Sequence, residues 1–459
     1  MNAYNRPFLG KLLNRLDEQP RFLQILIGPR QVGKTFAAKQ AERKVQDAGK
    51  IAIYVTADQL EPANPAWLKE RWENARQAGA HLLIVDEIQK VSRWSEVVKM
   101  LWDEDRLAGR PMHVWLLGSS SLNIQRGLTE SLAGRFELIR CGHWSWRECE
   151  KQFGWDFEQW LRFGGYPGAA EWIADETRWR AYIRDSMIET VLTRDVLNLR
   201  TITKPALLRQ LFNLVCQAPA QIVSYEKMLG QLTDAGNTTT LAHYLQVLAQ
   251  SFLCGGLSKF SRGVTRSKGS SPKLVIFNNA LVTALNPTQQ PPSPRLPSAE
   301  QAERAAGWAA WRGRLVENAV GAALVDVAAE ENWTVTYWRE RDHEVDFILE
   351  TSTELFAIEV KSGQPAASAG LKLFSHRYPD SLPVILGSAG LSFEKFFKLD
   401  AASMRIDLLR CGLSAKLNAP VEVSDDFGLV CFQNKINGKS GSYERQELDG
   451  RRILARLQN

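Results

Sequence analysis

Short apolar runs alternate with amphipathic stretches along the first third of the chain. The runs span Phe22–Ile27, Ile51–Val55, Leu82–Val85, Val114–Leu117 and Phe136–Ile139. Uninterrupted apolar runs of this length, separated by helical stretches, are typical of buried strands in a parallel sheet that is covered by helices. We therefore expect an α/β domain over residues 1–150.

Helical periodicity replaces this pattern from Trp155 to Gln250. Within it, residues 224–232, a turn at 234–236 and a stretch that opens at Asn237 predict a helix, a tight turn and a second helix, with Asn237 as the N-cap. Two strand-like pieces, Phe252–Leu257 and Leu274–Phe277, follow. The spacing predicts a helical domain over residues 151–285 that contains a winged helix-turn-helix.

A proline-rich stretch separates this domain from the last one. The prolines between Pro287 and Pro297 cannot lie inside regular structure, so we expect a linker over residues 286–304. A helical stretch and strand-like runs follow at Trp311–Ala329, Thr334–Trp338, Val345–Leu349 and Leu355–Val360. They predict a second α/β domain over residues 305–412, with a polar, weakly patterned tail over 413–459.

Composition narrows the class of protein. The chain has 459 residues, of which 44% are hydrophobic and 24% charged, and its formal net charge is +6. These values are typical of a folded chain of about three domains, and the charge alone does not require nucleic acid. The cysteines form no CxxC pair, which is typical of a reducing compartment. No run approaches the roughly 18 apolar residues of a membrane span, so we expect a cytoplasmic protein without membrane contact.

A phosphate-binding motif follows the first apolar run. Residues 28–35 read GPRQVGKT, a full match to G-x-x-x-x-G-K-[ST] between a strand and a helix. Its glycines let backbone N–H groups point at phosphate oxygens. Lys34 supplies a positive charge to the β and γ phosphates, and the Thr35 hydroxyl is a ligand for Mg²⁺. The predicted nucleotide-binding residues are Gly28, Pro29, Arg30, Gln31, Val32, Gly33, Lys34, Thr35 and Phe36. The alternative is a glycine turn that enters a helix.

An acidic pair follows the third apolar run, in the segment HLLIVDEIQ. Ligands of open α/β sheets bind at the carboxyl ends of the strands, where Asp86 and Glu87 would emerge. Asp86 would hold the Mg²⁺ shell, and Glu87 would orient and polarise the attacking water. Taken alone, such a pair is also a common helix start.

Two further positions have two interpretations each. Ser119, in the run that ends LLGSSS, either bonds the γ-phosphate or the attacking water, or belongs to a Gly-Ser turn. Arg135 either neutralises charge in the transition state, on its own nucleotide or on that of a neighbouring copy, or pairs with Glu137 at the surface. The predicted catalytic set is thus Glu87, Lys34, Ser119 and Arg135.

The order GPRQVGKT, LLIVDEIQ, LLGSSS and SLAGRFELI, followed by WSWRE, resembles the bacterial and archaeal AAA-type P-loop ATPases whose C-terminal half is a domain of unknown function. FGGYPGAA, RDV, SPKLVIFNNAL and EVDFIL with AIEVKSG extend the similarity over roughly residues 15 to 400. The resemblance implies an ATP-hydrolysing core that binds ATP and Mg²⁺, with Lys34, Thr35, Asp86 and Glu87 in their usual roles.

The middle domain carries a basic segment. Lys259, Arg262, Arg266, Lys268 and Lys273 lie on or between its two strand-like pieces, without an acidic residue among them. In a winged helix, Thr239 and His243 would face a DNA groove, and Arg262, Arg266 and Lys268 would contact phosphates. The alternative is a helical lid on the ATPase with a solvated basic loop.

Acidic residues recur in the last domain. Glu359 and Lys361 share one face of a strand-like run, and ending a buried strand in these charges is costly unless both are paired, hydrated or metal-bound. The pattern Asp346 and Glu359-Val-Lys361 resembles the PD-(D/E)xK nuclease core. The resemblance implies Mg²⁺ ligation by Glu317, Asp346 and Glu359, with Lys361 positioning the water; the alternative is an ordinary surface ion pair.

These features predict an ATPase that acts on or with DNA through a winged helix and a nuclease-like domain. The alternative function is a nucleotide-dependent switch whose last domain binds a partner without cleaving anything. A ring or dimer of identical chains is expected by analogy.

Overall fold

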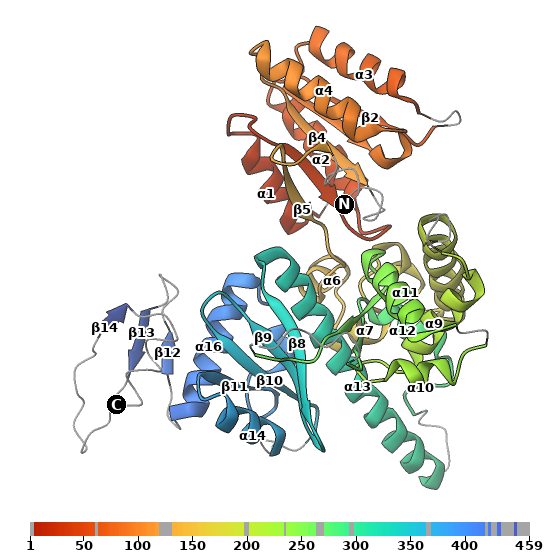
Figure 1. The fold of residues 1–459 in the computed structure, drawn as a ribbon, viewed down its shortest axis with the longest axis vertical. Helices are drawn as coiled ribbons and strands as arrows, with labels where there is room; N and C mark the ends of the chain where they lie inside the picture. The colour runs from red at the N-terminus through yellow and green to blue at the C-terminus, as the bar shows by residue number, and fades with distance from the viewer. Residues whose placement is uncertain are drawn as a thin grey trace.

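A computed structural model describes residues 4–59, 63–118, 131–196, 202–233, 236–262, 270–292, 298–363 and 369–417, together with the backbone of short strands beyond residue 420. The chain forms an N-terminal α/β domain, a helical middle and a C-terminal α/β domain (Figure 1). The predicted fold class is confirmed. No helix of these described residues is both long enough and apolar enough to cross a bilayer.

The N-terminal domain is built on a parallel sheet with strand order β2-β3-β4-β1-β5. Its strands are β1 (Leu23–Ile27), β2 (Ala52–Thr56), β3 (Leu82–Asp86), β4 (His113–Gly118) and β5 (Phe136–Arg140). Each lies within one residue of a predicted apolar run at both ends. Since parallel strands share one carboxyl edge, the ends of β1 and β3 meet there.

Helices cover both faces of this sheet because alternate strand residues point to opposite sides. Leu26 and Ile84 pack with the core on the side of α2, whereas Ile25 and Val85 pack with the core on the side of α3 and α4. Among the described residues, the helices of this domain are α1 (Pro7–Arg15), α2 (Lys34–Asp47), α3 (Pro65–Gln77), α4 (Trp94–Leu107) and the short 3₁₀ turn η1 (Ile88–Lys90).

The middle domain is helical, as predicted. Its first part comprises α6 (Trp146–Phe153), α7 (Phe157–Phe163), η2 (Pro167–Trp172), α8 (Glu176–Ala181), η3 (Tyr182–Ile188) and η4 (Val191–Val196). Within the stretch of predicted helical periodicity, η3 and η4 are π-helical. Its second part comprises α9 (Pro205–Gln217), α10 (Tyr225–Leu229), α11 (Thr238–Gln250), β6 (Cys254–Leu257), β7 (Lys273–Ile276) and α12 (Asn279–Leu285).

The predicted cap of α11 is confirmed, since the Asn237 side chain accepts a hydrogen bond from the Thr240 N–H at 2.8 Å. After it, β6 and β7 form an antiparallel hairpin. The segment behind β6 reaches the C-terminal domain: the Phe260 N–H donates to the Tyr337 carbonyl at 2.6 Å, and the Tyr337 N–H donates to the Ser258 carbonyl at 3.2 Å. The hairpin region therefore extends the C-terminal sheet.

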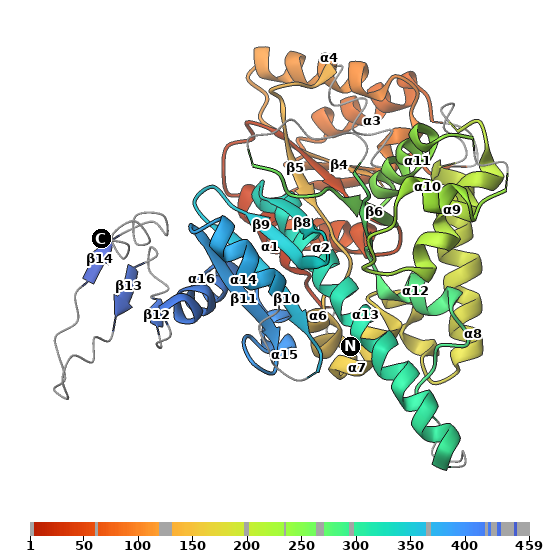
Figure 2. The same cartoon turned by 60° about the horizontal axis from the view of Figure 1, so that its bottom comes forward.

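The C-terminal domain has a mixed sheet in the order β11-β10-β9-β8, with α13 between this sheet and the middle helices (Figure 1, Figure 2). Its elements are α13 (Ser298–Glu331), β8 (Thr334–Glu340), β9 (His343–Glu350), β10 (Leu355–Lys361), α14 (Ala369–Arg377), β11 (Ser381–Gly387), α15 (Phe393–Phe396) and α16 (Ala401–Leu417). A small antiparallel sheet of β12 (Val421–Val423), β13 (Leu429–Phe432) and β14 (Arg445–Glu447) follows.

The structure differs from the predicted boundaries here. Helix α13 begins at Ser298, inside the expected linker, because an alanine-rich stretch follows Pro297 directly. Strand β11 was not predicted because it contains Pro383, which is tolerated at the sheet edge where β11 lies. Helix α16 continues to Leu417, past the expected boundary at 412.

Candidate nucleotide site and C-terminal carboxylate cluster

The predicted phosphate loop connects β1 to α2. A side chain at Gly28 would lie 2.0 Å from the Cys141 carbonyl oxygen, so only glycine fits there. Gly33, directly before α2, has a φ of +95°, a left-handed conformation that glycine adopts without strain. The loop therefore needs both glycines for its shape. Its backbone N–H groups lie next to the N-terminus of a 14-residue helix, which is the positive end of the helix dipole.

Lys34 is folded over this loop. Its ammonium group donates to the carbonyls of Gly28 at 2.8 Å and Pro29 at 2.5 Å. Burial lowers the pKa of Lys34, while Cys141, Glu87 and Asp86 act in the opposite direction. Phosphate oxygens would supply a second set of acceptors for this buried cation.

Asp86 accepts hydrogen bonds from three groups of the site. One carboxylate oxygen accepts from the Thr35 hydroxyl at 2.6 Å and from the Tyr54 hydroxyl at 2.8 Å, and the other accepts from the Glu87 N–H at 2.9 Å. Burial and the neighbouring Asp86 raise the pKa of Tyr54, so its hydroxyl stays protonated and keeps donating. Thr35 and Asp86 are oxygen donors of the kind that Mg²⁺ prefers.

Glu87 follows Asp86 in a left-handed conformation, with a φ of 54°. The Gln89 amide donates to its carboxylate, and the side chain is half-buried at the carboxyl edge of β3. Positive φ is uncommon outside glycine, and such strain is often kept where a side chain must point in one direction. The structure thus gathers the predicted Lys34, Thr35, Asp86 and Glu87 at one edge of the sheet.

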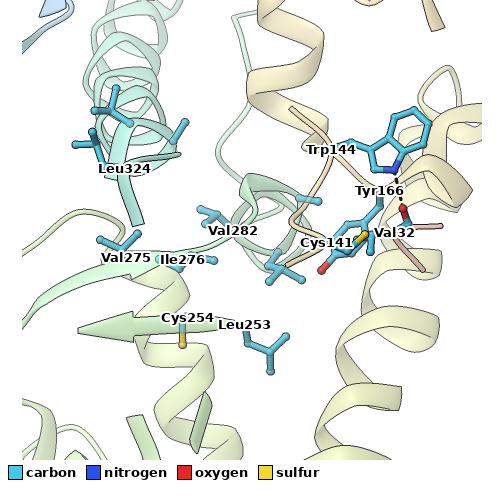
Figure 3. Close-up of a cluster of buried hydrophobic side chains, with 14 of the residues drawn as sticks. Val32, Cys141, Trp144, Tyr166, Leu253, Cys254, Val275, Ile276, Val282 and Leu324 are labelled. Atoms are coloured by element: carbon cyan, nitrogen blue, oxygen red, sulfur yellow. Dashed lines mark hydrogen bonds between the residues drawn. The ribbon is translucent and has the colours of Figure 1, made fainter. Parts of the chain in front are cut away.

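Residues that the sequence did not single out hold the loop from outside. The Val32 carbonyl accepts from the Arg6 guanidinium at 3.0 Å and from the Trp144 indole N–H at 2.9 Å, the bond drawn in Figure 3. The Tyr182 hydroxyl donates to the Gln31 amide oxygen at 2.5 Å. Trp144 lies in WSWRE, so the resemblance gave a sequence signal for it, whereas Tyr182 lies outside the motifs that carry the resemblance.

The other loop residues are placed as follows. Pro29 and Val32 are buried, Arg30 is half-buried and Gln31 is exposed. Phe36, in the first turn of α2, is 55% exposed, which leaves its ring available to a ligand.

The two remaining catalytic predictions have different outcomes. Ser119 lies outside the described residues. Arg135 precedes β5, whose first residue pairs with the first residue of β1, so it lies at the opposite edge of the sheet, roughly 16 Å along the strands from the phosphate loop. A contact with the nucleotide of its own chain is therefore wrong, and so is the surface pair with Glu137, because Arg135 binds Asp103 through two bonds of 2.8 and 3.0 Å.

The predicted DNA-contacting residues have three different outcomes. Thr239 and His243 are exposed on α11. Arg262 instead forms an ion pair with Asp380 of the C-terminal domain, with a bond of 2.9 Å. Arg266 and Lys268 lie outside the described residues. Lys273 was included in the basic segment, but its side chain is fully buried, which excludes it from a solvated phosphate-binding surface.

Lys273 is the centre of the C-terminal carboxylate cluster. Its ammonium nitrogen lies 2.5 Å from Glu317, 3.1 Å from Glu344 and 3.3 Å from Asp346. Glu359 lies outside this group and pairs with Lys361 at 2.7 Å. Sequence reasoning missed Glu344, although its spacing of two residues from Asp346 puts both on one face of β9.

Burial and mutual repulsion dominate the electrostatics of this cluster. Burial raises the pKa of Glu317, and the nearby Asp346 raises it further. Burial alone would lower the pKa of Lys273, but Asp346, Glu317 and Glu344 together raise it. Lys273 therefore stays charged, and its charge offsets part of the repulsion among the carboxylates.

Comparison with known families assigns each part of the chain separately. Residues 21–150 match the family described as AAA domain. Residues 154–291 and 312–393 match two families that are each described as a domain of unknown function, DUF8612 and DUF4143. Together with the fold described above, this match supports a P-loop ATPase domain of the AAA type at the N-terminus. The resemblance seen in the sequence is confirmed to that extent, whereas the winged helix and the nuclease-like core stay predictions.

Relatives extend over most of the chain. The uncharacterized protein Rv2008c of Mycobacterium tuberculosis is 26% identical over 352 residues, which cover 76% of this chain and 72% of that protein. The uncharacterized protein MJ1544 of Methanocaldococcus jannaschii is 21% identical over 363 residues, which cover 74% of this chain and 75% of that protein.

Solved structures resemble it more distantly. AMPPCP-bound DnaA from Aquifex aeolicus is 13% identical, covers 55% of this chain and 89% of its own, and has a TM-score of 0.30. Cdc6p from Pyrobaculum aerophilum is 11% identical, and the match covers 63% of this chain and 97% of that structure, with a TM-score of 0.29. At these values neither structure defines a partner for this chain.

Proposed function

We propose that this protein hydrolyses ATP at the loop of residues 28–35 and acts with DNA through its middle domain. The observation that carries the ATPase part is the 2.6 Å hydrogen bond between Thr35 and Asp86, which joins the first turn of α2 to the end of β3. A hydroxyl and a carboxylate held together beside a buried lysine form the donor set that a magnesium-bound triphosphate needs.

Each residue then has a separate role. The loop N–H groups and Lys34 bind the phosphates, and Thr35 and Asp86 would hold Mg²⁺, which offsets phosphate charge when bound. Glu87, fixed by its own backbone and by Gln89, accepts a proton from the attacking water. Tyr54 keeps Asp86 oriented through its hydroxyl.

The ATPase assignment predicts different failures for two variants. Lys34→Ala removes the buried cation, so we expect ATP affinity to fall at least about tenfold. Glu87→Gln keeps the shape of the site and loses the proton acceptor, so it should bind ATP with near wild-type affinity and turn over about 100-fold more slowly or worse. Calorimetric titration and a phosphate-release assay measure the two quantities.

Lys44→Ala is the matched control, since Lys44 is exposed near the end of the same helix. We expect it to behave as wild type in both assays. Retained turnover in Glu87→Gln would exclude Glu87 as the water-polarising residue.

Helices α10 and α11 support the DNA part of the proposal. Thr239 and His243 are exposed on α11, while Leu241, Tyr244 and Leu248 on its other side are buried. The Tyr244 hydroxyl accepts from the Lys204 N–H at 2.9 Å, which fixes α11 against the start of α9. An exposed helix face on a rigid three-helix base is the form in which helix-turn-helix proteins enter the major groove.

DNA binding is testable without knowing the target sequence. We expect duplex DNA to raise ATP turnover and to increase the anisotropy of a labelled duplex at low salt, and both effects to weaken as salt rises. Thr239→Ala with His243→Ala should weaken binding about tenfold, whereas Asn213→Ala, on an exposed position of α9, should not. If duplex and single-stranded DNA change neither turnover nor anisotropy, the DNA assignment fails.

A second candidate is a nucleotide-dependent switch whose C-terminal domain binds a partner without cleavage. The pairing of Glu359 with Lys361 favours it, because Glu359 then does not join Glu317 and Asp346 as the nuclease resemblance requires. DNA-independent turnover would select this candidate.

Arg135 can have a catalytic role only at the nucleotide site of a neighbouring chain. It lies far from its own phosphate loop, so a catalytic role requires a homo-oligomer in which it reaches the nucleotide of the next copy. Sedimentation of ATP-bound Glu87→Gln protein tests for such a ring or dimer.

A further inference from the structure

A lysine of the middle domain enters the C-terminal carboxylate cluster. Lys273 is the first residue of β7, and its side chain has no exposed surface. Its ammonium group contacts Glu317 of α13 and Glu344 and Asp346 of β9, so it bridges two domains as well as three carboxylates. It also lies 4.9 Å from the centre of the Phe347 ring.

The position of this ammonium group is fixed by backbone pairing. Residue 273 pairs with Leu257 in the hairpin, and Ile276, at the other end of β7, exchanges two hydrogen bonds of 2.8 and 2.7 Å with the Asn318 side chain of α13. Asn318 and Glu317 are neighbours on that helix. The same register that joins β7 to α13 therefore delivers Lys273 to Glu317.

The implied magnesium site of a nuclease does not fit this arrangement. One oxygen from each of Glu317, Glu344 and Asp346 lies within 4.8 Å of the others, a spacing at which an ion could be shared. Mg²⁺ binds such oxygens at about 2.0–2.1 Å. An ion at that distance would lie in the volume that the Lys273 ammonium group fills, 2.5 to 3.3 Å from the same oxygens.

The neighbouring carboxylates have partners of their own among the described residues. The second oxygen of Asp346 accepts from the Val360 N–H at 2.8 Å, and Glu359 is paired with Lys361. The carboxylates nevertheless need a cation, because burying like charges together is unfavourable.

We propose that Lys273 is the resident cation of this cluster, and that it latches the β6–β7 hairpin onto the C-terminal domain while excluding divalent metal from it. The inference concerns the regulation of the nuclease-like site in the proposed function. A metal could enter only after β7 withdraws.

The test compares Mn²⁺ binding by the full chain without nucleotide, measured by electron paramagnetic resonance. Wild type should bind no Mn²⁺ that depends on Asp346, so wild type and Asp346→Asn should bind equal amounts. Lys273→Met, which keeps the length of the side chain and removes its charge, should gain one bound Mn²⁺ that a second change, Asp346→Asn, abolishes. Its melting temperature should be lower than that of wild type and should rise with added Mn²⁺.

Lys259→Met is the matched control, because Lys259 follows β6 in the same region and is exposed. It should bind no additional ion. A wild-type Mn²⁺ site that Asp346→Asn removes would overturn the proposal, and so would a folded Lys273→Met protein that binds none. Should Lys273→Met fail to fold, the comparison of wild type with Asp346→Asn still decides. The Mn²⁺ measurement does not depend on ATP turnover, so its result can be distinguished from a failure of the ATPase assignment.

Discussion

Arg6 connects the start of the chain to the phosphate loop. Its guanidinium forms two bonds with Glu148, of 2.8 and 3.0 Å, and donates a third to the Val32 carbonyl. Both side chains of the ion pair are 7% exposed. Burying such a pair costs desolvation energy, and losing one partner leaves an uncompensated charge in a largely buried position.

We therefore expect Glu148→Gln to destabilise the protein by about 3 kcal/mol, because Arg6 would stay buried without its counter-charge. Denaturant unfolding of the full chain, followed by tryptophan fluorescence, measures this loss. Glu150→Gln is the control on the same helix: Glu150 is 43% exposed and pairs with Lys398 at the surface, so its loss should cost less than about 1 kcal/mol. Equal effects of the two changes would contradict the role given to Arg6.

Motif spacing explains which site residues could be predicted from sequence. Lys34 and Thr35 belong to one contiguous loop, and Asp86 directly ends an apolar run, so each carries a local signal. Tyr54 and Lys273 reach their partners only through the fold. Tyr54 is an ordinary strand residue until β2 is placed beside β3, and no local pattern marks a lysine that will be buried.

At the level of elements, the π-helical segment η3 touches the phosphate loop. Tyr182, its first residue, donates to Gln31, and Gly168 of η2 leaves room for the contact, since a side chain there would lie 2.5 Å from the Tyr182 hydroxyl. Gln31 has a positive φ of 58°, so its conformation is strained without support. The contact supports the loop from the middle domain.

Tyr182→Phe should weaken ATP binding by up to about fivefold, because a lost hydrogen bond of this kind contributes about 1 kcal/mol. Global stability should hardly change. Titration with ATP and thermal unfolding of the same sample separate the two effects. Tyr225→Phe, at a half-buried tyrosine of α10, is the control and should leave affinity unaltered. A large fall in melting temperature for Tyr182→Phe would mean that the hydroxyl serves folding rather than the loop.

Elements with a single strong signal were predicted well. Strands β1, β3 and β4 are short apolar runs buried on both faces, so composition alone marks them. Strand β11 and the start of α13 depend on context: the first tolerates Pro383 because it lies at an edge, and the second extends into a proline-rich region after its last proline.

The whole molecule is more continuous than its three family matches. One hydrophobic core includes Leu9 of α1, Val32 of the phosphate loop, Tyr166, Ile276 of β7 and Leu324 of α13, and Figure 3 shows the last four of these together. The proline-rich stretch indicated separable domains, but packing between distant segments leaves no local trace in the sequence. Nucleotide binding at Val32 and docking of β7 thus act on a shared core.

The same packing between domains protects the edge of the C-terminal sheet. Strand β8 is the outer strand, and backbone bonds from residues 258 and 260 cover it at Tyr337. A shortened chain that began at Ser298 would lack this cover as well as Lys273. It would expose an open strand to other copies of itself and retain a cluster of unbalanced acids, so aggregation is its expected fate. Fragments for crystallisation or expression should therefore start ahead of the β6–β7 hairpin.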